Sequence, residues 1–265
     1  ALEHLMWLHN VPVGMLSKLM EMQTFQAIEI FVDDSCTNPN LTDERPYPVG
    51  PQGTTMKSSW EEARMMIEEL LQYWSYLKVP PIQVRFFNRM NVIHLAKQKG
   101  ETPTQFFERC QQLLEEAFRE TNNTGSSIGP EQMMQSFLRY SADQRVFRYL
   151  IFRRYDARGP VVDMIRKRNN PQDHPMSLIS CSYMDKRDDT DMIEALDTRT
   201  QYCSFSQSYN HEKKRIPQHQ GDAFPYSYGL HIMNRMVGAL NPDDLDMMNE
   251  KVPLTLPIMS VLMGY

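Results

Sequence analysis

The sequence lacks the cysteine pairs that indicate a zinc site or a disulfide framework. Its four cysteines are scattered along the chain, and no two of them form a C-x-x-C pair. They are Cys36, Cys110, Cys181 and Cys203. Scattered cysteines are typical of free thiols in a reducing compartment, so we expect an intracellular, cytoplasmic protein.

The chain also has no run of about 18 consecutive apolar residues, so we expect no membrane span. We expect no signal peptide in the first residues, because Glu3, His4 and His9 interrupt the stretch where a continuous apolar segment would stand. The chain has fewer basic than acidic residues. It has 28 Lys and Arg and 33 Asp and Glu, for a net charge of −5. Non-specific nucleic-acid binding needs clustered cations, so we expect no nucleic-acid partner.

Enough apolar sequence is present for a sizeable core, since 41% of the 265 residues are hydrophobic and 23% are charged. Segments with helical spacing of apolar residues alternate with short β-rich runs. The expected strands are 27–32, 82–87, 91–96, 146–152 and 176–183, and the expected helices lie within 1–24, 58–77, 102–118, 131–141, 160–168, 191–196 and 228–240. This alternation predicts an α/β fold with a doubly wound, mostly parallel sheet flanked by helices.

The predicted organisation is one domain with two additions. Residues 1–24 form an N-terminal helical extension, 25–240 form the domain, and 241–265 form a C-terminal tail packed on it. Two polar stretches, 38–57 and 203–221, have no strand or helix periodicity, and we expect them to be loops. Loops of this length favour contacts within a larger assembly.

The most informative segment runs from Ile28 to Thr37, where an apolar strand stops at an acid. Ligand sites in open α/β sheets lie at the carboxyl ends of the strands. Asp33, Ser35 and Thr37 form a D-x-S-x-T array, in which one carboxylate and two hydroxyls offer hard oxygen ligands to Mg²⁺. In this array the sequence resembles the von Willebrand factor A (vWA) domain, whose metal-ion-dependent adhesion site has D-x-S-x-S in this position.

The resemblance covers residues 25–240 and includes two later positions. Ser127, or its neighbour Ser126, lies in a Gly-containing loop where the vWA family has a Thr. Asp156 is the acid that stands near the family's later Asp, although its spacing to Pro160 is one residue longer than in the family pattern. The resemblance therefore implies a vWA-like fold with a divergent metal site.

The roles of these residues follow from the resemblance. It implies that Ser35 and Thr37 bind the ion directly, that Asp33 acts through water or hydrogen bonds, that Ser127 binds directly or nearly so, and that Asp156 lies outside the direct ligands. In the family, Mg²⁺ or Mn²⁺ is held with one open position, which an Asp or Glu of a partner protein fills. The expected function is a protein–protein interaction module.

A metal-free structural scaffold is an alternative for the same fold. Arg153, Arg154 and Arg158 surround Asp156 in the sequence, and cations at that position would oppose a divalent ion. If the site is degenerate, the chain needs no cofactor.

A third hypothesis is a haloacid-dehalogenase-like phosphatase. That superfamily also has an acid after an apolar strand, in a D-x-D-x-T motif whose first Asp attacks phosphoryl groups. Asp33 and Thr37 match the motif, but Ser35 stands where the general acid/base should be, and the best later acids lie in 188–191. We expect binding and not catalysis, because no nucleophile has an evident base beside it.

Overall fold

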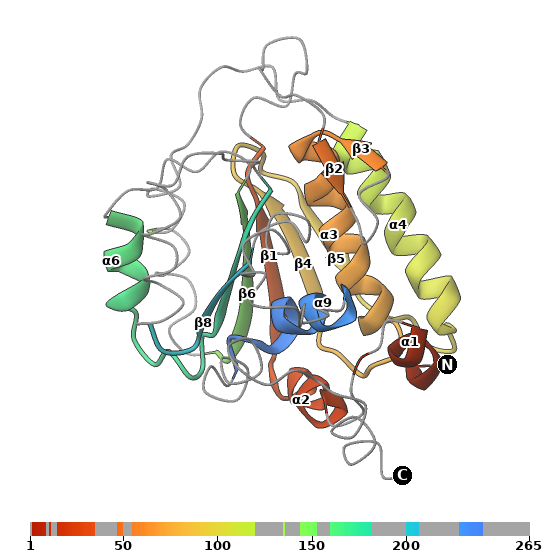
Figure 1. The fold of residues 1–265 in the computed structure, drawn as a ribbon, viewed down its shortest axis with the longest axis horizontal. Coiled ribbons are helices and arrows are strands. Elements are labelled where there is room, and N and C mark those ends of the chain that lie inside the picture. Colours follow the sequence, from red (N-terminus) through yellow and green to blue (C-terminus); the bar gives the residue numbers. More distant parts are fainter. Residues whose placement is uncertain are drawn as a thin grey trace, which may run out of the picture.

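The fold is built on a six-stranded sheet with helices on both sides, as Figure 1 shows. It is described from a computed structural model. The described residues are 2–8, 11, 15–34, 47–49, 55–119, 135, 144–152, 160–181, 200–206 and 228–240. Two short helices, α1 (Leu2–Leu8) and α2 (Met15–Glu21), and a 3₁₀ turn, η1 (Met22–Thr24), precede the sheet. Both helices lie within residues 1–24, where helix was expected.

The sheet has the strand order β5-β4-β1-β6-β7-β8, and only β5, at one edge, runs antiparallel to its neighbour. The six strands are β1 (Ala27–Val32), β4 (Ile82–Phe86), β5 (Val92–Leu95), β6 (Val146–Phe152), β7 (Met176–Ser180) and β8 (Cys203–Ser206). The prediction of a doubly wound, mostly parallel α/β sheet is confirmed. Because the chain order reverses between β1 and β6, a crevice for ligands is expected at the carboxyl ends of these two strands.

Within the described residues, four further helices flank the sheet. They are α3 (Ser59–Trp74), α4 (Pro103–Arg119), α6 (Pro160–Arg166) and α9 (Tyr228–Val237). In Figure 1, α3 and α4 lie on one side of the sheet and α6 lies on the other. Helix α3 begins with the predicted capping box, in which Ser58 and Glu61 satisfy each other's backbone N–H groups.

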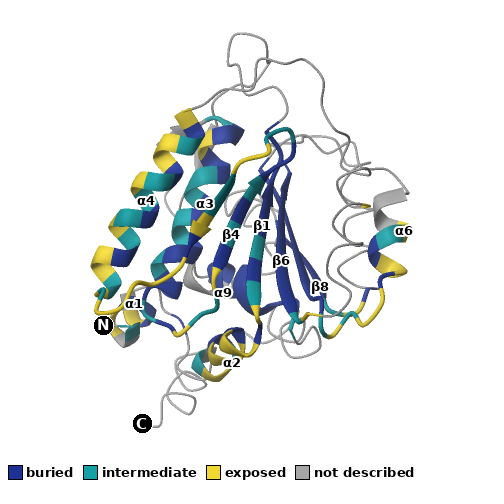
Figure 2. Ribbon diagram, turned by 180° about the vertical axis from the view of Figure 1, so that it is seen from behind, coloured by how far each residue is buried: buried dark blue, intermediate teal, exposed yellow. Residues whose placement is uncertain are grey.

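The main core lies between the sheet and the α3 side. Strand alternation turns Ile28, Ile30 and Val32 of β1 toward this core, and all three are fully buried. Trp74, in the last turn of α3, is also fully buried, and its ring contacts Tyr149 of β6 edge-on with centroids 5.5 Å apart. The N-terminal helices add apolar side chains to the same core: Leu5, Met6, Leu19 and Met22. Figure 2 shows the resulting band of buried residues through the sheet.

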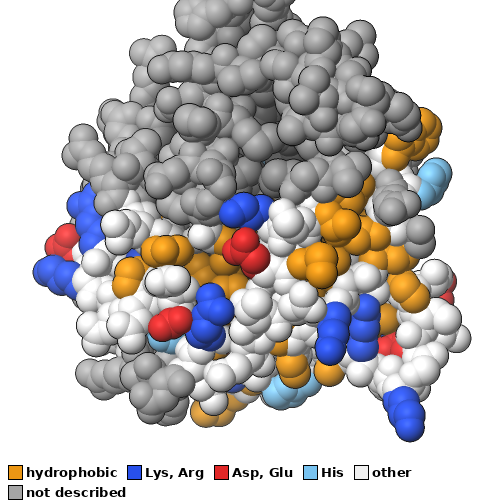
Figure 3. Space-filling model, turned by 90° about the horizontal axis from the view of Figure 1, so that it is seen from below, with side chains coloured by type: hydrophobic (Ala, Val, Ile, Leu, Met, Phe, Trp, Pro, Cys, Tyr) orange, Lys and Arg blue, Asp and Glu red, His pale blue; other side chains and the backbone are white. Residues whose placement is uncertain are grey.

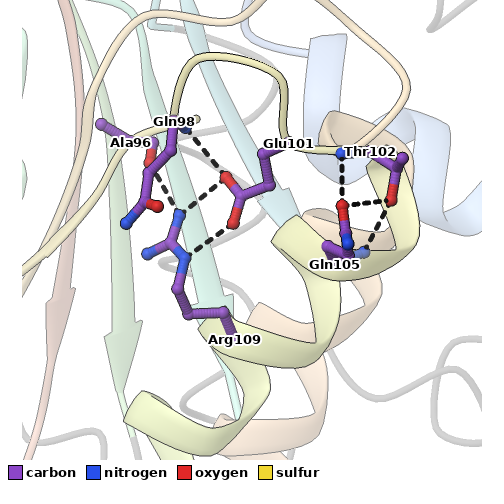
Figure 4. Close-up of polar contacts among 6 residues, drawn as sticks. All are labelled: Ala96, Gln98, Glu101, Thr102, Gln105 and Arg109. Carbon is purple, nitrogen blue, oxygen red and sulfur yellow. Dashed lines mark hydrogen bonds and ion pairs between the residues drawn. The ribbon is translucent and has the colours of Figure 1, made fainter.

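The start of α4 is fixed by two groups of polar contacts, drawn in Figure 4. Thr102 caps the helix, since its Oγ1 accepts from the backbone N–H of Gln105. Arg109 donates from Nε and Nη2 to the two carboxylate oxygens of Glu101, and Nη2 also donates to the carbonyl of Ala96. The Arg109 hydrogen bonds hold the pKa of Glu101 at about 2. These contacts join α4 to the chain that follows β5.

Three predictions of local structure need correction. Residues 38–57 are not all loop, because β2 (Tyr47–Val49) and β3 (Thr55–Lys57) pair as an antiparallel hairpin. Residues 203–221 are also not all loop, because 203–206 form β8, the outermost parallel strand. The strand expected over 176–183 ends at Ser180. The helix predictions for 131–141 and 191–196, and the packing of the tail 241–265, lie essentially outside the described residues.

Candidate functional site at the carboxyl end of the sheet

Asp33 comes directly after β1, at the carboxyl end of the parallel strands. Its backbone N–H donates to the carbonyl of Ile151 in β6 at 2.9 Å, which keeps the chain extended one residue beyond the strand. Strand alternation places Asp33 on the face of Phe31, opposite to the face of Val32. Only 5% of Asp33 is exposed. The acid that the sequence singled out is therefore fixed and largely shielded from water at the switch point between β1 and β6.

Two phenylalanines flank Asp33 at the ends of the neighbouring strands. Phe87 and Phe152 follow the residues that pair with Val32 in β4 and β6. Both rings are buried, and they contact each other edge-on with centroids 6.2 Å apart. A carboxylate in apolar surroundings attracts a nearby cation more strongly than one in water, because less solvent screens the charge.

Asp34 has a different role from Asp33, although the two acids are adjacent in sequence. Asp34 points to the opposite face, where it is fully buried. Its Oδ1 accepts from the backbone N–H and the side-chain amide of Asn88, both at 2.8 Å, and its Oδ2 lies 3.2 Å from Nε of Arg89. These contacts join the end of β1 to the turn between β4 and β5, so Asp34 is committed to structure and is not available to a metal.

Arg89 extends this contact to the ends of two helices. Its Nη1 donates to the carbonyl of Ala117, in the last turn of α4, at 2.7 Å. Its guanidinium lies over the ring of Phe86 at 4.5 Å and near the ring of Trp60, in the first turn of α3, at 5.6 Å. Trp60 in turn donates from Nε1 to the carbonyl of Phe118 at 2.9 Å. Sequence patterns did not indicate this network, because its members come from four separate segments.

The other residues of the predicted metal site lie outside the described part of the chain. They are Ser35, Thr37, Ser127 and Asp156, together with the arginines beside Asp156 and the acids of 188–191 in the phosphatase hypothesis. Within the described residues, no three His, Cys, Asp or Glu side chains come together as a metal site. The ligand set therefore stays a prediction, with Asp33 as its one described member.

A second charged cluster lies at the opposite, amino end of the sheet. Arg148 in β6 is 1% exposed and pairs with Glu29 of β1 through Nε at 3.1 Å. Its Nη1 lies 3.1 Å from Nδ1 of His174, so that ring nitrogen must accept and the imidazole is neutral. Burial, reinforced by the Arg148 charge, lowers the pKa of His174. This cluster anchors the turn before β7 to the sheet and is remote from Asp33.

Figure 3 looks at that amino end from below. Its described part mixes apolar side chains with Lys, Arg, Asp and Glu, and no one sign of charge dominates. Two large apolar side chains are exposed on the helices that precede β1: Trp7 on α1 and Met20 on α2. A mixed surface of this kind gives no charge complementarity that would favour one class of ligand.

One buried acid near the start of α3 gives a pH-dependent prediction. Glu62 is 3% exposed, and its Oε2 has no hydrogen-bond donor among the described residues. Burial raises the pKa of Glu62 well above its ordinary value of 4.5, although Arg235 partly opposes the shift. Arg235 itself pairs with Glu69 at 2.9 Å. The folded chain therefore favours the protonated form of Glu62.

Glu62→Gln should stabilise the protein at pH 7 and have little effect at pH 4. In the unfolded chain Glu62 loses its proton near pH 4.5, whereas the folded chain holds it to higher pH, so wild-type stability falls as the pH rises from about 4.5 through the folded pKa. Urea unfolding of both chains at the two pH values measures this difference. Glu116→Gln, at an exposed position on α4, is the control and should change stability little at either pH. Equal stability of wild type and Glu62→Gln at pH 7 would contradict the assignment.

Comparison with known proteins gives similarities of fold. No family model matches the sequence, and no curated protein matches it. The SpRpn10 VWA domain is similar over 69% of this chain and 87% of that chain, with 9% identity and a TM-score of 0.39. BatB from Bacteroides thetaiotaomicron is similar over 72% of this chain and 94% of that chain, with 13% identity and a TM-score of 0.40.

A longer protein also shares this similarity. Proximal thread matrix protein 1 from the mussel byssus is similar over 71% of this chain, with 12% identity and a TM-score of 0.41. The similar region is 45% of that protein, so this chain spans less than half of its length. These similarities concern the fold alone.

None of the described helices is both long enough and apolar enough to cross a bilayer.

Proposed function

We propose that the protein is an interaction module that binds a carboxylate of a partner protein through a Mg²⁺ or Mn²⁺ ion at the carboxyl end of its sheet. The observation that carries the proposal is the position of Asp33. It follows the central strand β1, lies at the switch point of the sheet, and is 5% exposed. Open α/β sheets bind ligands at this position.

The chemistry of the proposed ligands suits these ions. Ser35 and Thr37 would supply hydroxyl oxygens directly, with Ser127 as a further hydroxyl, and Asp33 would orient ligands or water from its shielded position. An all-oxygen set favours Mg²⁺ and Mn²⁺ over zinc and copper. With so few carboxylates the ion retains positive charge and open positions, which a partner's Asp or Glu can fill.

The described surroundings of Asp33 support binding more than catalysis. A phosphatase needs a second group that transfers a proton to the leaving group. The residues that flank Asp33 at the ends of β4 and β6 are Phe87 and Phe152, which cannot transfer protons. The expected partner is another protein with an exposed acid. Among the described residues, the buried cysteines Cys110, Cys181 and Cys203 form no disulfide, which fits the expected reducing, intracellular environment.

Titration calorimetry with Mg²⁺ and with Mn²⁺ tests this function. The wild-type chain should bind the ion with modest affinity, and acetate, as the simplest carboxylate, should tighten that affinity relative to chloride at equal ionic strength. The reason is that a carboxylate which occupies the open position of the ion stabilises the ion on the protein. Ser35→Ala combined with Thr37→Ala should abolish both effects.

The controls separate the alternatives. Ion binding that survives the double substitution would place the ion elsewhere. Absence of binding in the wild-type chain, with and without acetate, would contradict the proposal and favour the metal-free scaffold. Hydrolysis of p-nitrophenyl phosphate with Mg²⁺, lost in Asp33→Asn, would favour the phosphatase hypothesis.

A further inference from the structure

We propose that His174 is an acid-sensitive clasp: when its imidazole takes up a proton, it releases the turn before β7 from the sheet. This turn, residues 167–175, joins α6 to β7 at the amino end of the sheet, so the proposal is independent of the ion site. Only 6% of His174 is exposed. The residue is therefore held inside the structure, although its side chain is one that gains a charge in mild acid.

Backbone hydrogen bonds on both sides of His174 continue the sheet into the turn. The N–H of Val146 donates to the carbonyl of Asp173 at 2.9 Å, and the N–H of Arg148 donates to the carbonyl of Pro175 at 3.0 Å. His174 lies between these two acceptors, so a change at its side chain acts on the segment that pairs with the first residues of β6.

The side chain of His174 contacts a guanidinium that tolerates only the neutral imidazole. Nη1 of Arg148 lies 3.1 Å from Nδ1 of His174, and an arginine can donate but not accept. Protonation at Nδ1 would place two N–H groups against each other. It would also add a positive charge beside Arg148, which is 1% exposed and pairs with Glu29 at 3.1 Å. Like charges that are shielded from water repel strongly.

A second guanidinium, that of Arg168, joins the turn to its neighbours. Its Nε donates to the carbonyl of His174 at 3.1 Å, and its Nη1 donates to the carbonyl of Ile165, in α6, at 2.7 Å. Its Nη2 donates to the carbonyls of Gln201 and Tyr202, before β8, at 2.7 and 2.8 Å. Movement of His174 would therefore also loosen the contacts that join α6, β7 and β8.

The charges around His174 favour its neutral form. Among the described residues, Arg148 and Arg168 oppose its protonation, whereas Glu29 and Asp173 favour it. Glu29 is paired with Arg148, and the side chain of Asp173 is 45% exposed, so water screens its charge. Burial and the Arg148 charge thus keep the pKa of His174 below its ordinary value of 6.5. The clasp holds fully above about pH 6.5 and weakens as the pH falls through the pKa of the folded chain.

Hydrogen exchange followed by NMR at pH 7 and pH 5 tests the clasp. Protection factors remove the ordinary pH dependence of exchange. Those of the Val146, Arg148 and Met176 amides should fall severalfold at pH 5, whereas that of Ile30 in β1 should not. The limit is about 30-fold, for a histidine of unfolded pKa 6.5 that stays neutral in the folded chain. Met176 reports on β8, because its N–H donates to the carbonyl of Tyr202.

An acid on α3 shifts stability in the opposite direction over the same pH range. Burial raises the pKa of Glu69 to about 6, so the folded chain binds this proton more readily than the unfolded chain does. The stability that this group contributes rises as the pH falls. A loss of protection confined to the turn would therefore report local opening and not unfolding of the whole chain.

A variant and the titration of the wild-type chain make the test specific. In His174→Asn, the amide oxygen can replace Nδ1 as an acceptor but gains no proton, so the turn should keep its protection at pH 5. His94→Asn, at an exposed position on β5, is the matched control and should lose protection as wild type does.

Three results would overturn the inference: a wild-type His174 that titrates at or above its ordinary 6.5, a loss of protection at Ile30 equal to that of the turn, or a His174→Asn chain as acid-sensitive as wild type. The titration of His174, followed by NMR of the imidazole, needs no variant. It therefore decides the question even if His174→Asn fails to fold.

Discussion

Asp34→Ala should lower the free energy of unfolding by about 3 to 5 kcal/mol, the usual effect of removing one partner of a buried ion pair. The substitution removes the acceptor for two hydrogen bonds from Asn88 and leaves the Arg89 guanidinium without its carboxylate in a largely buried position. Urea unfolding followed by circular dichroism measures the change. The loss should persist in high salt, because a buried pair is poorly screened.

Asp34→Asn is the matched control. It keeps an oxygen that can accept from Asn88 but removes the negative charge that faces Arg89, so its loss of stability should be smaller than that of Asp34→Ala. If Asp34→Ala is as stable as wild type, Asp34 is not the structural acid that its contacts indicate. The same result would weaken the distinction between Asp33 as the site acid and Asp34 as the structural acid.

Trp74→Ala should lower the free energy of unfolding by about 3 to 5 kcal/mol, as expected for a large aromatic residue removed from a core. Trp74 is fully buried in the last turn of α3 and contacts Tyr149 of the central sheet. Its removal leaves a cavity between the helix layer and the sheet. Urea unfolding should show a lower midpoint with a cooperative transition retained.

Two phenylalanine substitutions make this prediction sharper. The Nε1–H of Trp74 has no acceptor among the described residues, whereas that of Trp60 donates to the carbonyl of Phe118. Trp74→Phe therefore removes a donor that has no acceptor among the described residues, whereas Trp60→Phe removes an existing hydrogen bond. Trp60→Phe should therefore lower the free energy of unfolding by about 1 kcal/mol more than Trp74→Phe does. Equal losses of stability in Trp74→Phe and Trp60→Phe would contradict these hydrogen-bond assignments. A negligible loss in Trp74→Ala would contradict the packing of Trp74 in the core.

Strong periodic segments were predictable from the sequence, and weak ones were not. Strand 27–32 and its neighbour 146–152 are apolar apart from one charged residue each, Glu29 and Arg148, and both have the predicted bounds. Strand β8 was missed because Ser204 and Ser206 are buried in it, and hydroxyl residues give no apolar signal. The β2–β3 hairpin was missed because each strand has three residues, too few to show an alternation.

The site was predictable only where its signal is local. Asp33 stands out because an apolar strand stops at it, and the structure places it at the carboxyl end of the sheet as expected. The role of Asp34 depends on Asn88 and Arg89, which are more than 50 residues away in sequence, so no local pattern could indicate it. The proposed ligands Ser35, Thr37 and Ser127 remain predictions from the sequence.

Paramagnetic broadening by Mn²⁺ in the ¹H–¹⁵N spectrum tests the location of the proposed site most directly. If the ion binds at the carboxyl end of the sheet, the amide signals of Asp33, Phe87 and Phe152 should broaden first. The amide signals of Arg148 and His174, toward the amino end, should persist at the same Mn²⁺ concentration. Uniform broadening, or broadening that begins at the amino end, would contradict an ion site beside Asp33.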